Sequence, residues 1–203
     1  MNETKISLSE QELKMVEDAG IILTKNRIIE KAGLLLAELQ QDYYTVLQKP
    51  GINLPGEIQQ SSPKISRGEN YEGLPYLILD YPRYFTRQDI FAIRTMFWWG
   101  HFFSITLHLS GIYKINFANQ VKNAAGILKE NEFHISTGEN EWSHHFEKNN
   151  YLQLQMMDEV SFDKKLNEGT FIKLAKKYPI NNWHVVTGML EKDFKLLTGI
   201  CSG

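Results

Sequence analysis

The spacing of apolar residues predicts two helices at the start of the chain. Within residues 26–48 an apolar stripe recurs at helical intervals, which indicates one face packed into a core. Its members are Ile28, Ala32, Leu35, Leu36, Leu39, Tyr43, Val46 and Leu47. A shorter helix is predicted over residues 7–20, where Ser7 and Ser9 each precede a glutamate by three positions, the spacing of a capping box.

Residues 49–75 interrupt this regular pattern. Four of the six prolines and four glycines fall within them, and both residue types disfavour helices and central strands. We therefore expect a long loop here, either ordered against the rest of the chain or mobile as a lid or linker.

The next part of the chain alternates and is rich in aromatic residues, which predicts β-structure. Residues 75–81, 90–99 and 101–110 are each interpreted as a strand, and the short connections between them predict an antiparallel meander. Residues 87–99 also allow a helix, because the stretch from Thr86 to Asp89 resembles a capping sequence and Gly100 a helix stop. The aromatic and β-branched composition favours the strand.

The remaining elements complete an α+β pattern. A helix is predicted over residues 117–128 and a strand over 132–137, followed by a hairpin of 142–147 with 151–157, and then helices over 170–178 and 183–197. Strands that follow one another through short turns indicate a mainly antiparallel sheet. The sequence therefore predicts a single α+β domain over residues 1–203, with about 5–6 strands by the segment pattern and helices from both chain ends packed together.

Composition narrows the classes of function. The formal net charge is −2, which favours neither nucleic acid nor an anionic membrane as a partner. One cysteine, no secretory leader and no apolar run of about 20 residues predict a cytoplasmic protein that does not span a membrane. The sequence holds no GxGxxG, GxxxxGK[ST], CxxC, HExxH or GxSxG motif, so no cofactor and no structural zinc are predicted.

Arginines and aromatic rings are concentrated in one part of the chain. Four of the five arginines and eleven of the 24 aromatic residues lie between positions 67 and 103. Arginine pairs with carboxylates and stacks on rings, so these residues serve either structure or ligand recognition. The predicted ligand-binding residues are Arg67, Arg83, Arg87, Arg94, Tyr81, Trp98 and Trp99.

The run Phe97-Trp98-Trp99 predicts large rings on both faces of the sheet, because side chains of a strand alternate between its two faces. One face of the sheet packs on the helices, and the other still carries large rings that need a cover. The 49–75 loop, a second subunit and a ligand are the covers that the sequence leaves open.

Histidines and one carboxylate provide the candidate catalytic groups. His108, His134 and His145 share a face if their segments are strands of one sheet. Three imidazoles suit a borderline metal such as zinc, but no motif spacing enforces a site, so hydrogen-bonded side chains are the simpler interpretation. Asp80 ends an otherwise apolar strand, where pairing with Arg83 or Arg94 is expected.

Two hypotheses follow from these residues. The first is a binding or interaction module whose aromatic and arginine surface receives a small ligand, a peptide or a second copy of the chain. The alternative is a metal-assisted or acid/base hydrolase that uses His108, His134 or His145 with Asp80 and an arginine.

Overall fold

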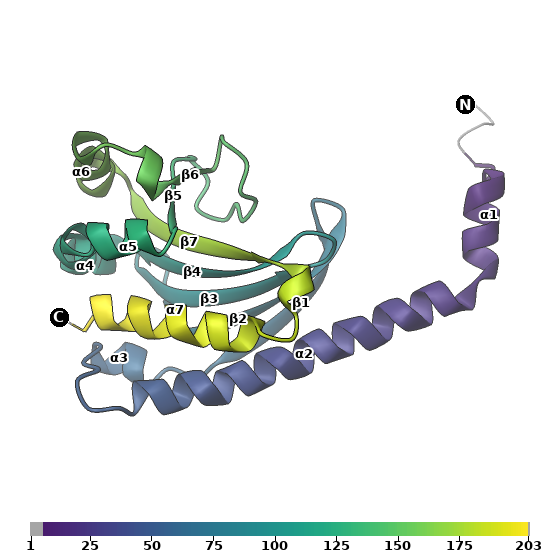
Figure 1. Ribbon diagram of the computed structural model, residues 1–203, viewed down its shortest axis with the longest axis horizontal. Coiled ribbons are helices and arrows are strands. Elements are labelled where there is room, and N and C mark those ends of the chain that lie inside the picture. The colour runs from purple at the N-terminus through teal and green to yellow at the C-terminus, as the bar shows by residue number, and fades with distance from the viewer. Residues whose placement is uncertain (1–5, 203) are drawn as a thin grey trace.

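The computed structural model describes residues 6–202 and contains a seven-stranded antiparallel sheet (Figure 1). The strand order is β1-β2-β3-β4-β7-β5-β6. The strands are β1 Lys64–Tyr71, β2 Leu74–Phe85, β3 Ile90–Trp98, β4 Phe102–Ser110, β5 His134–Ser136, β6 Tyr151–Gln153 and β7 Phe171–Pro179. The predicted α+β class with an antiparallel sheet is confirmed, and the strand count is slightly higher than the 5–6 expected.

Helices from both chain ends cover one face of the sheet. α2 (Ala19–Leu47) and α7 (Val186–Ile200) run beside each other there (Figure 1), as predicted. The ring of Tyr43 on α2 stacks on that of Phe194 on α7, with centroids 3.7 Å apart. The other helices are α1 Glu10–Glu17, α3 Gly56–Gln59, α4 Gly111–Asn123, α5 Ala125–Glu130 and α6 Glu159–Glu168, with single 3-10 turns at Leu154–Met156 and Ile180–Asn182.

Strands β2 to β4 form the predicted three-stranded meander, and the strand interpretation of residues 90–98 is confirmed. β1 pairs with the outer edge of β2 and extends the meander to four strands. The stretch that resembled a helix cap is a turn between β2 and β3, closed by a hydrogen bond from the Thr86 amide to the Asp89 carbonyl oxygen at 2.9 Å. The Thr86 hydroxyl accepts a hydrogen bond from the Asp89 amide at 2.9 Å, as a helix cap would, but β3 begins at the next residue. Gly111 links β4 to α4 with φ +57°, and a Cβ there would meet the Asp89 carboxylate at 2.1 Å. The tight junction therefore requires glycine at this position.

The two faces of the sheet bury different side chains. Leu79, Ile93 and Leu107 are among those that face the helices, whereas Trp98 and Phe102 pack on the opposite side, which we call the second face. This division of the aromatic run between two faces is as predicted.

The prediction of a continuous loop over residues 49–75 is wrong for its second half. Residues 64–71 are the edge strand β1, which pairs with β2 as far as Tyr71, and residues 56–59 form the short helix α3. Pro50, Pro55 and Pro63 all precede the strand, so they remove no hydrogen bond from it.

Two predictions for the later part of the chain are also wrong. Residues 170–178 are not a helix, because Phe171–Pro179 is strand β7 between β4 and β5. Residues 142–147 are not a strand, and β6 pairs with β5 instead. Residues 137–150 lie without regular secondary structure over the second face, and we call them the covering segment.

The first helix projects away from the sheet (Figure 1). It begins with the predicted capping box, in which Ser9 and Glu12 exchange hydrogen bonds between side chains and backbone amides. α2 follows directly and carries the predicted core stripe in its second half. Within residues 6–202, every helix is too short or too polar to cross a lipid bilayer.

Candidate functional site

Strand register brings a row of polar side chains together on the second face. Asp80 of β2 lies opposite Arg94 of β3, and Arg94 lies opposite Thr106 of β4. One step along, His108 of β4 lies opposite Lys173 of β7. These side chains are largely buried, and a buried polar group is stable only when it is paired. The covering segment supplies several of the partners.

Asp80 and Arg94 form a bidentate ion pair, which confirms the predicted pairing of Asp80 with an arginine. Arg94 Nε lies 2.7 Å from one carboxylate oxygen of Asp80 and Nη2 lies 3.0 Å from the other. The third nitrogen, Nη1, is 3.1 Å from Nε2 of His144 in the covering segment. Burial, with the nearby charges of Lys173 and Arg94, holds the pKa of His144 well below its usual value. Its imidazole is therefore neutral, and Nε2 accepts the hydrogen bond from Arg94.

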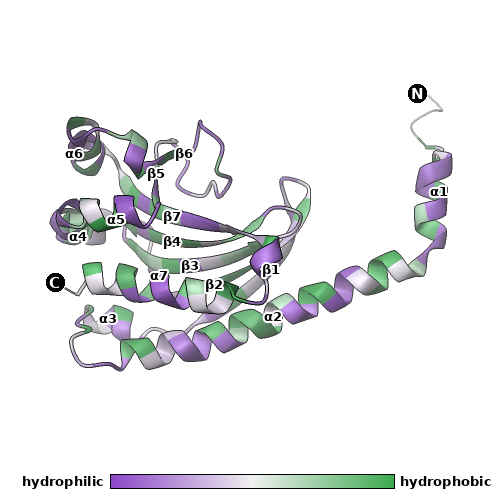
Figure 2. Ribbon diagram, in the orientation of Figure 1, coloured by the Kyte–Doolittle hydropathy of each residue, from purple (hydrophilic) through white to green (hydrophobic). Residues whose placement is uncertain are grey.

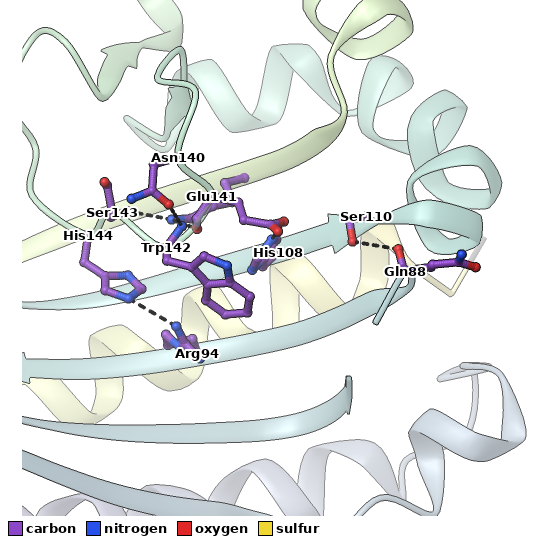
Figure 3. A network of polar contacts seen from close by, with 10 residues as sticks. Gln88, Arg94, His108, Ser110, Asn140, Glu141, Trp142, Ser143 and His144 are labelled. Atoms are coloured by element: carbon purple, nitrogen blue, oxygen red, sulfur yellow. Dashed lines mark hydrogen bonds and ion pairs between the residues drawn. The ribbon is translucent and has the colours of Figure 1, made fainter. Parts of the chain in front are cut away.

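His108 makes a second contact with the covering segment. Its Nε2 lies 2.9 Å from a carboxylate oxygen of Glu141 (Figure 3). Burial lowers the pKa of His108 to about 3, with Lys173 and Arg94 adding to the effect. The contact is therefore a hydrogen bond from a neutral imidazole to a carboxylate and not an ion pair, and it assigns the proton to Nε2.

Lys173 is the most unusual group on this face, because its side chain is fully buried. Its amine donates hydrogen bonds to the carbonyl oxygens of Glu141 at 2.8 Å and Ser143 at 2.7 Å. Burial lowers the pKa of Lys173 to about 7, and Arg94 acts in the same direction. Near neutral pH the amine therefore exists in both its charged and its neutral form, and even the neutral form has the two N–H groups needed for the two carbonyl acceptors.

Tyr71, at the end of β1, anchors the covering segment from the other side. Its hydroxyl accepts hydrogen bonds from the backbone amides of His144 at 2.6 Å and His145 at 3.2 Å. With the contacts to Arg94, His108 and Lys173, this attaches the middle of the covering segment to four strands of the sheet. Trp142 belongs to the same part of the covering segment, and Figure 3 shows its ring lying over Arg94 and beside His108.

A groove of about 610 Å³ lies beside these contacts, over β1 to β3. Trp142 and His144 form the wall on the side of the covering segment, and the sheet forms the rest. The residues that line it are Lys64, Ser66, Tyr71, Tyr76, Ile78, Asp80, Arg83, Phe85, Arg94, Trp142 and His144. Its size lies within the range of small-molecule sites, roughly 300–1,000 Å³.

Two cations of this groove are available to a ligand. In the part of the chain that the structure describes, neither Lys64 nor Arg83 forms an ion pair with a carboxylate. Arg83 is held through its Nε, which donates to the Ser62 carbonyl oxygen at 3.0 Å. That contact leaves the terminal nitrogens of the guanidinium to the groove.

The structure brings only some of the predicted ligand-binding residues together. Arg83 and Arg94 line the groove, whereas Arg87 is exposed in the turn between β2 and β3 and Arg67 pairs with Glu69 at 2.7 Å. Tyr81 is buried in the core on the helix side, and Trp99 packs against that core.

Trp98 is covered by its own chain. Its side chain is 2% exposed, and its ring stacks on His101 with centroids 3.7 Å apart. Tyr71 and Phe102 meet it edge to face. Of the three covers that the sequence left open, the 49–75 stretch contributes through Tyr71, and neither a second subunit nor a ligand is needed to enclose the ring.

The candidate histidines have separate surroundings. His108 contacts Glu141, His134 packs edge to face on Phe146, and His145 lies 4.0 Å from a Glu72 oxygen. Between residues 6 and 202, no group of three or more His, Cys, Asp or Glu side chains is arranged to hold a metal ion.

Sequence reasoning did not identify Lys173, Glu141, Trp142 and His144 as site residues. Lys173 was placed in the helix predicted over residues 170–178. The partners of these residues lie 30 to 50 residues away in sequence, so no local pattern marks them. The one available signal was the cluster of Trp142, His144 and His145 in a short segment without a clear period.

Comparison with known proteins does not assign this chain to a family. No protein-family model, no curated protein and no solved structure matches the chain. The fold and the site define an α+β protein with a groove on one face of its sheet, and function is inferred from the chemistry of that groove.

Proposed function

We propose that this protein is a binding module for a small anionic ligand that carries a planar ring. The observation that carries the proposal is the pair of cations, Lys64 and Arg83, on the wall of a groove that is otherwise rich in aromatic side chains. Of the ligands that the sequence left open, the groove favours a small molecule, because it is a concave site of molecular size and not an extended surface.

The lining residues divide the recognition between them. Tyr71, Tyr76, Phe85 and Trp142 offer ring faces and edges against which a planar group can pack. Arg83 offers two terminal nitrogens in the fork geometry that suits a carboxylate or phosphate. Arg94 is already held by Asp80 and His144, so its role is to fix the floor of the groove.

Calorimetric titration of the full chain with matched probes tests the proposal. Adenosine monophosphate and 4-hydroxybenzoate carry a ring and an anion, and adenosine and 4-hydroxybenzamide are the uncharged counterparts. At least one anionic probe should bind, its counterpart should bind at least tenfold more weakly, and added salt should reduce the affinity.

Variants locate the binding. Arg83→Gln should weaken binding about tenfold, the equivalent of about 1.4 kcal/mol, and Trp142→Ala should weaken it as well. Arg87→Gln is the matched control, since Arg87 is exposed in the neighbouring turn outside the groove. If the anionic probes bind no better than their neutral counterparts, or if Arg83→Gln and Arg87→Gln behave alike, the proposal is wrong.

The hydrolase alternative and the cytoplasmic location stay predictions. The histidines required by the hydrolase contact different partners across the described chain, so no single constellation favours that activity.

A further inference from the structure

The projecting part of the chain, residues 6–27, exposes an unusual number of apolar side chains, and we call it the arm. α1 has no buried residue, and the first turns of α2 extend beyond the sheet (Figure 2). Eight of the 18 exposed large hydrophobic residues of the described chain lie between positions 6 and 23. They are Ile6, Leu8, Leu13, Met15, Val16, Ile21, Ile22 and Leu23.

On its own, α1 is not stable in water. α1 is eight residues long, and helices shorter than about 12 residues are marginal without tertiary packing. The capping box at Ser9 contributes about 1 kcal/mol, which does not offset the cost of nucleation. A contiguous exposed apolar surface is typical of an interaction site. The exposed apolar side chains of α1 and of the first turns of α2 therefore favour a partner surface.

The apolar stripe of α2 shows how the partner packs. Ile29, Ala32 and Leu36 are buried in the core, and Ile22 continues the same stripe seven residues earlier, where it is 56% exposed. The face of α2 that is buried against the core beside the sheet is therefore exposed where the helix continues into the arm. A second helix laid on it would extend the core outward.

Charge along the arm and the next turn of α2 favours a second copy of this chain as the partner. Residues 10–18 carry four acids and one lysine, a net charge of −3, whereas residues 25–31 carry three bases and one acid, a net charge of +2. The six residues between them, Ala-Gly-Ile-Ile-Leu-Thr, are uncharged. The pattern is self-complementary about Ile21 and Ile22, as an interface with two-fold symmetry requires.

We propose that this protein forms a homodimer through the arm, with the acidic α1 of each copy against the basic residues 25–31 of the other and the Ile21–Leu23 cluster at the centre. An anionic membrane is a poorer partner, because the acidic tip would be repelled by it. Lys25 also pairs with Glu69 of its own β1 at 2.6 Å, so Arg27 and Lys31 provide the free basic charge. The interface is separate from the groove on the second face.

Sedimentation equilibrium of the full chain at 1–100 µM tests the dimer. The wild-type chain should be dimeric in the upper part of this range. Ile22→Glu should make it monomeric, and Ile115→Glu on α4, where Ile115 is 72% exposed, should leave the dimer intact. Circular dichroism shows whether each variant keeps its fold. A monomer at 100 µM, or a dimer that survives Ile22→Glu, would overturn the proposal.

Charge reversal tests the arrangement within the dimer. Glu10→Lys with Glu17→Lys should weaken self-association at least tenfold, and so should Arg27→Glu with Lys31→Glu. Glu12 is left in place because it belongs to the capping box. An equimolar mixture of the two reversed chains should recover dimers of mixed composition. Failure of that recovery, or flotation of the wild-type chain with phosphatidylserine vesicles in place of self-association, contradicts the proposed partner.

Discussion

The buried amine of Lys173 predicts a specific dependence of stability on pH. Its folded-state pKa is about 7, whereas a lysine in an unfolded chain titrates at about 10.4. Between these values the unfolded chain holds a proton that the folded protein lacks. Because stability rises with pH wherever the unfolded state binds more protons, the free energy of unfolding should increase from pH 7 upward.

The magnitude follows from the two pKa values. Between pH 7 and pH 8, the lysine alone should add about 1 kcal/mol to the free energy of unfolding. The histidines with lowered pKa values contribute in the same direction but mainly below pH 7. The difference between the wild-type chain and Lys173→Met removes that shared background.

Urea unfolding at pH 7.0, 7.5 and 8.0, at constant ionic strength, measures the effect. The stability difference between the wild-type chain and Lys173→Met should change by about 1 kcal/mol over this range, in favour of the wild-type chain at higher pH. Lys177→Met is the matched control, because Lys177 is exposed and lies four residues further along the same strand. It should follow the wild-type pH dependence. Parallel curves for the wild-type chain and Lys173→Met would refute the lowered pKa of the buried amine.

Two further substitutions test the contacts of the second face. Trp98→Ala should reduce the free energy of unfolding by about 3–5 kcal/mol, because it empties a fully buried site. The affinity of the folded protein for an anionic probe should stay unchanged. A loss of free energy smaller than this range, measured by urea unfolding, would show that the ring is not enclosed. Arg94→Met should cost about 3–5 kcal/mol by leaving the Asp80 carboxylate buried without its partner. Adding Asp80→Leu to that variant should recover most of the loss in chemical denaturation, and an additive loss would argue against the pair.

The elements near the start of the chain were predictable because their patterns are local. The stripe of α2 recurs at helical intervals, so that helix could be assigned from spacing. For β3, where spacing also allowed a helix, the aromatic and β-branched composition decided for the strand. The pairing of Asp80 with an arginine followed from a charge at the end of an apolar strand.

Strand β7 was misassigned because it is buried on both faces and carries lysines on both. Lys173 faces the second face, and Lys176 faces the helices, where it contacts Asp193 at 3.4 Å. Each amine interrupts the alternation that would have marked a strand, and what remains resembles helical spacing. The covering segment was missed for a related reason. This segment is held in place by contacts with Arg94, His108 and Lys173, and no local sequence pattern predicts contacts between residues so far apart in the chain.

The position of β7 in the sheet has a consequence for how the protein is made. β4 is buried along its whole length, yet β7, which pairs with one of its edges, ends 69 residues after β4 does. At a synthesis rate of about 5–20 residues per second, a ribosome needs roughly 3–14 s to cover that distance. During that interval the edge of β4 is an unpaired apolar strand on the nascent chain, open to pairing with its neighbours. Solubility during expression therefore depends on how fast residues 111–179 are translated and on chaperones that shield this edge, and not only on the stability of the finished fold.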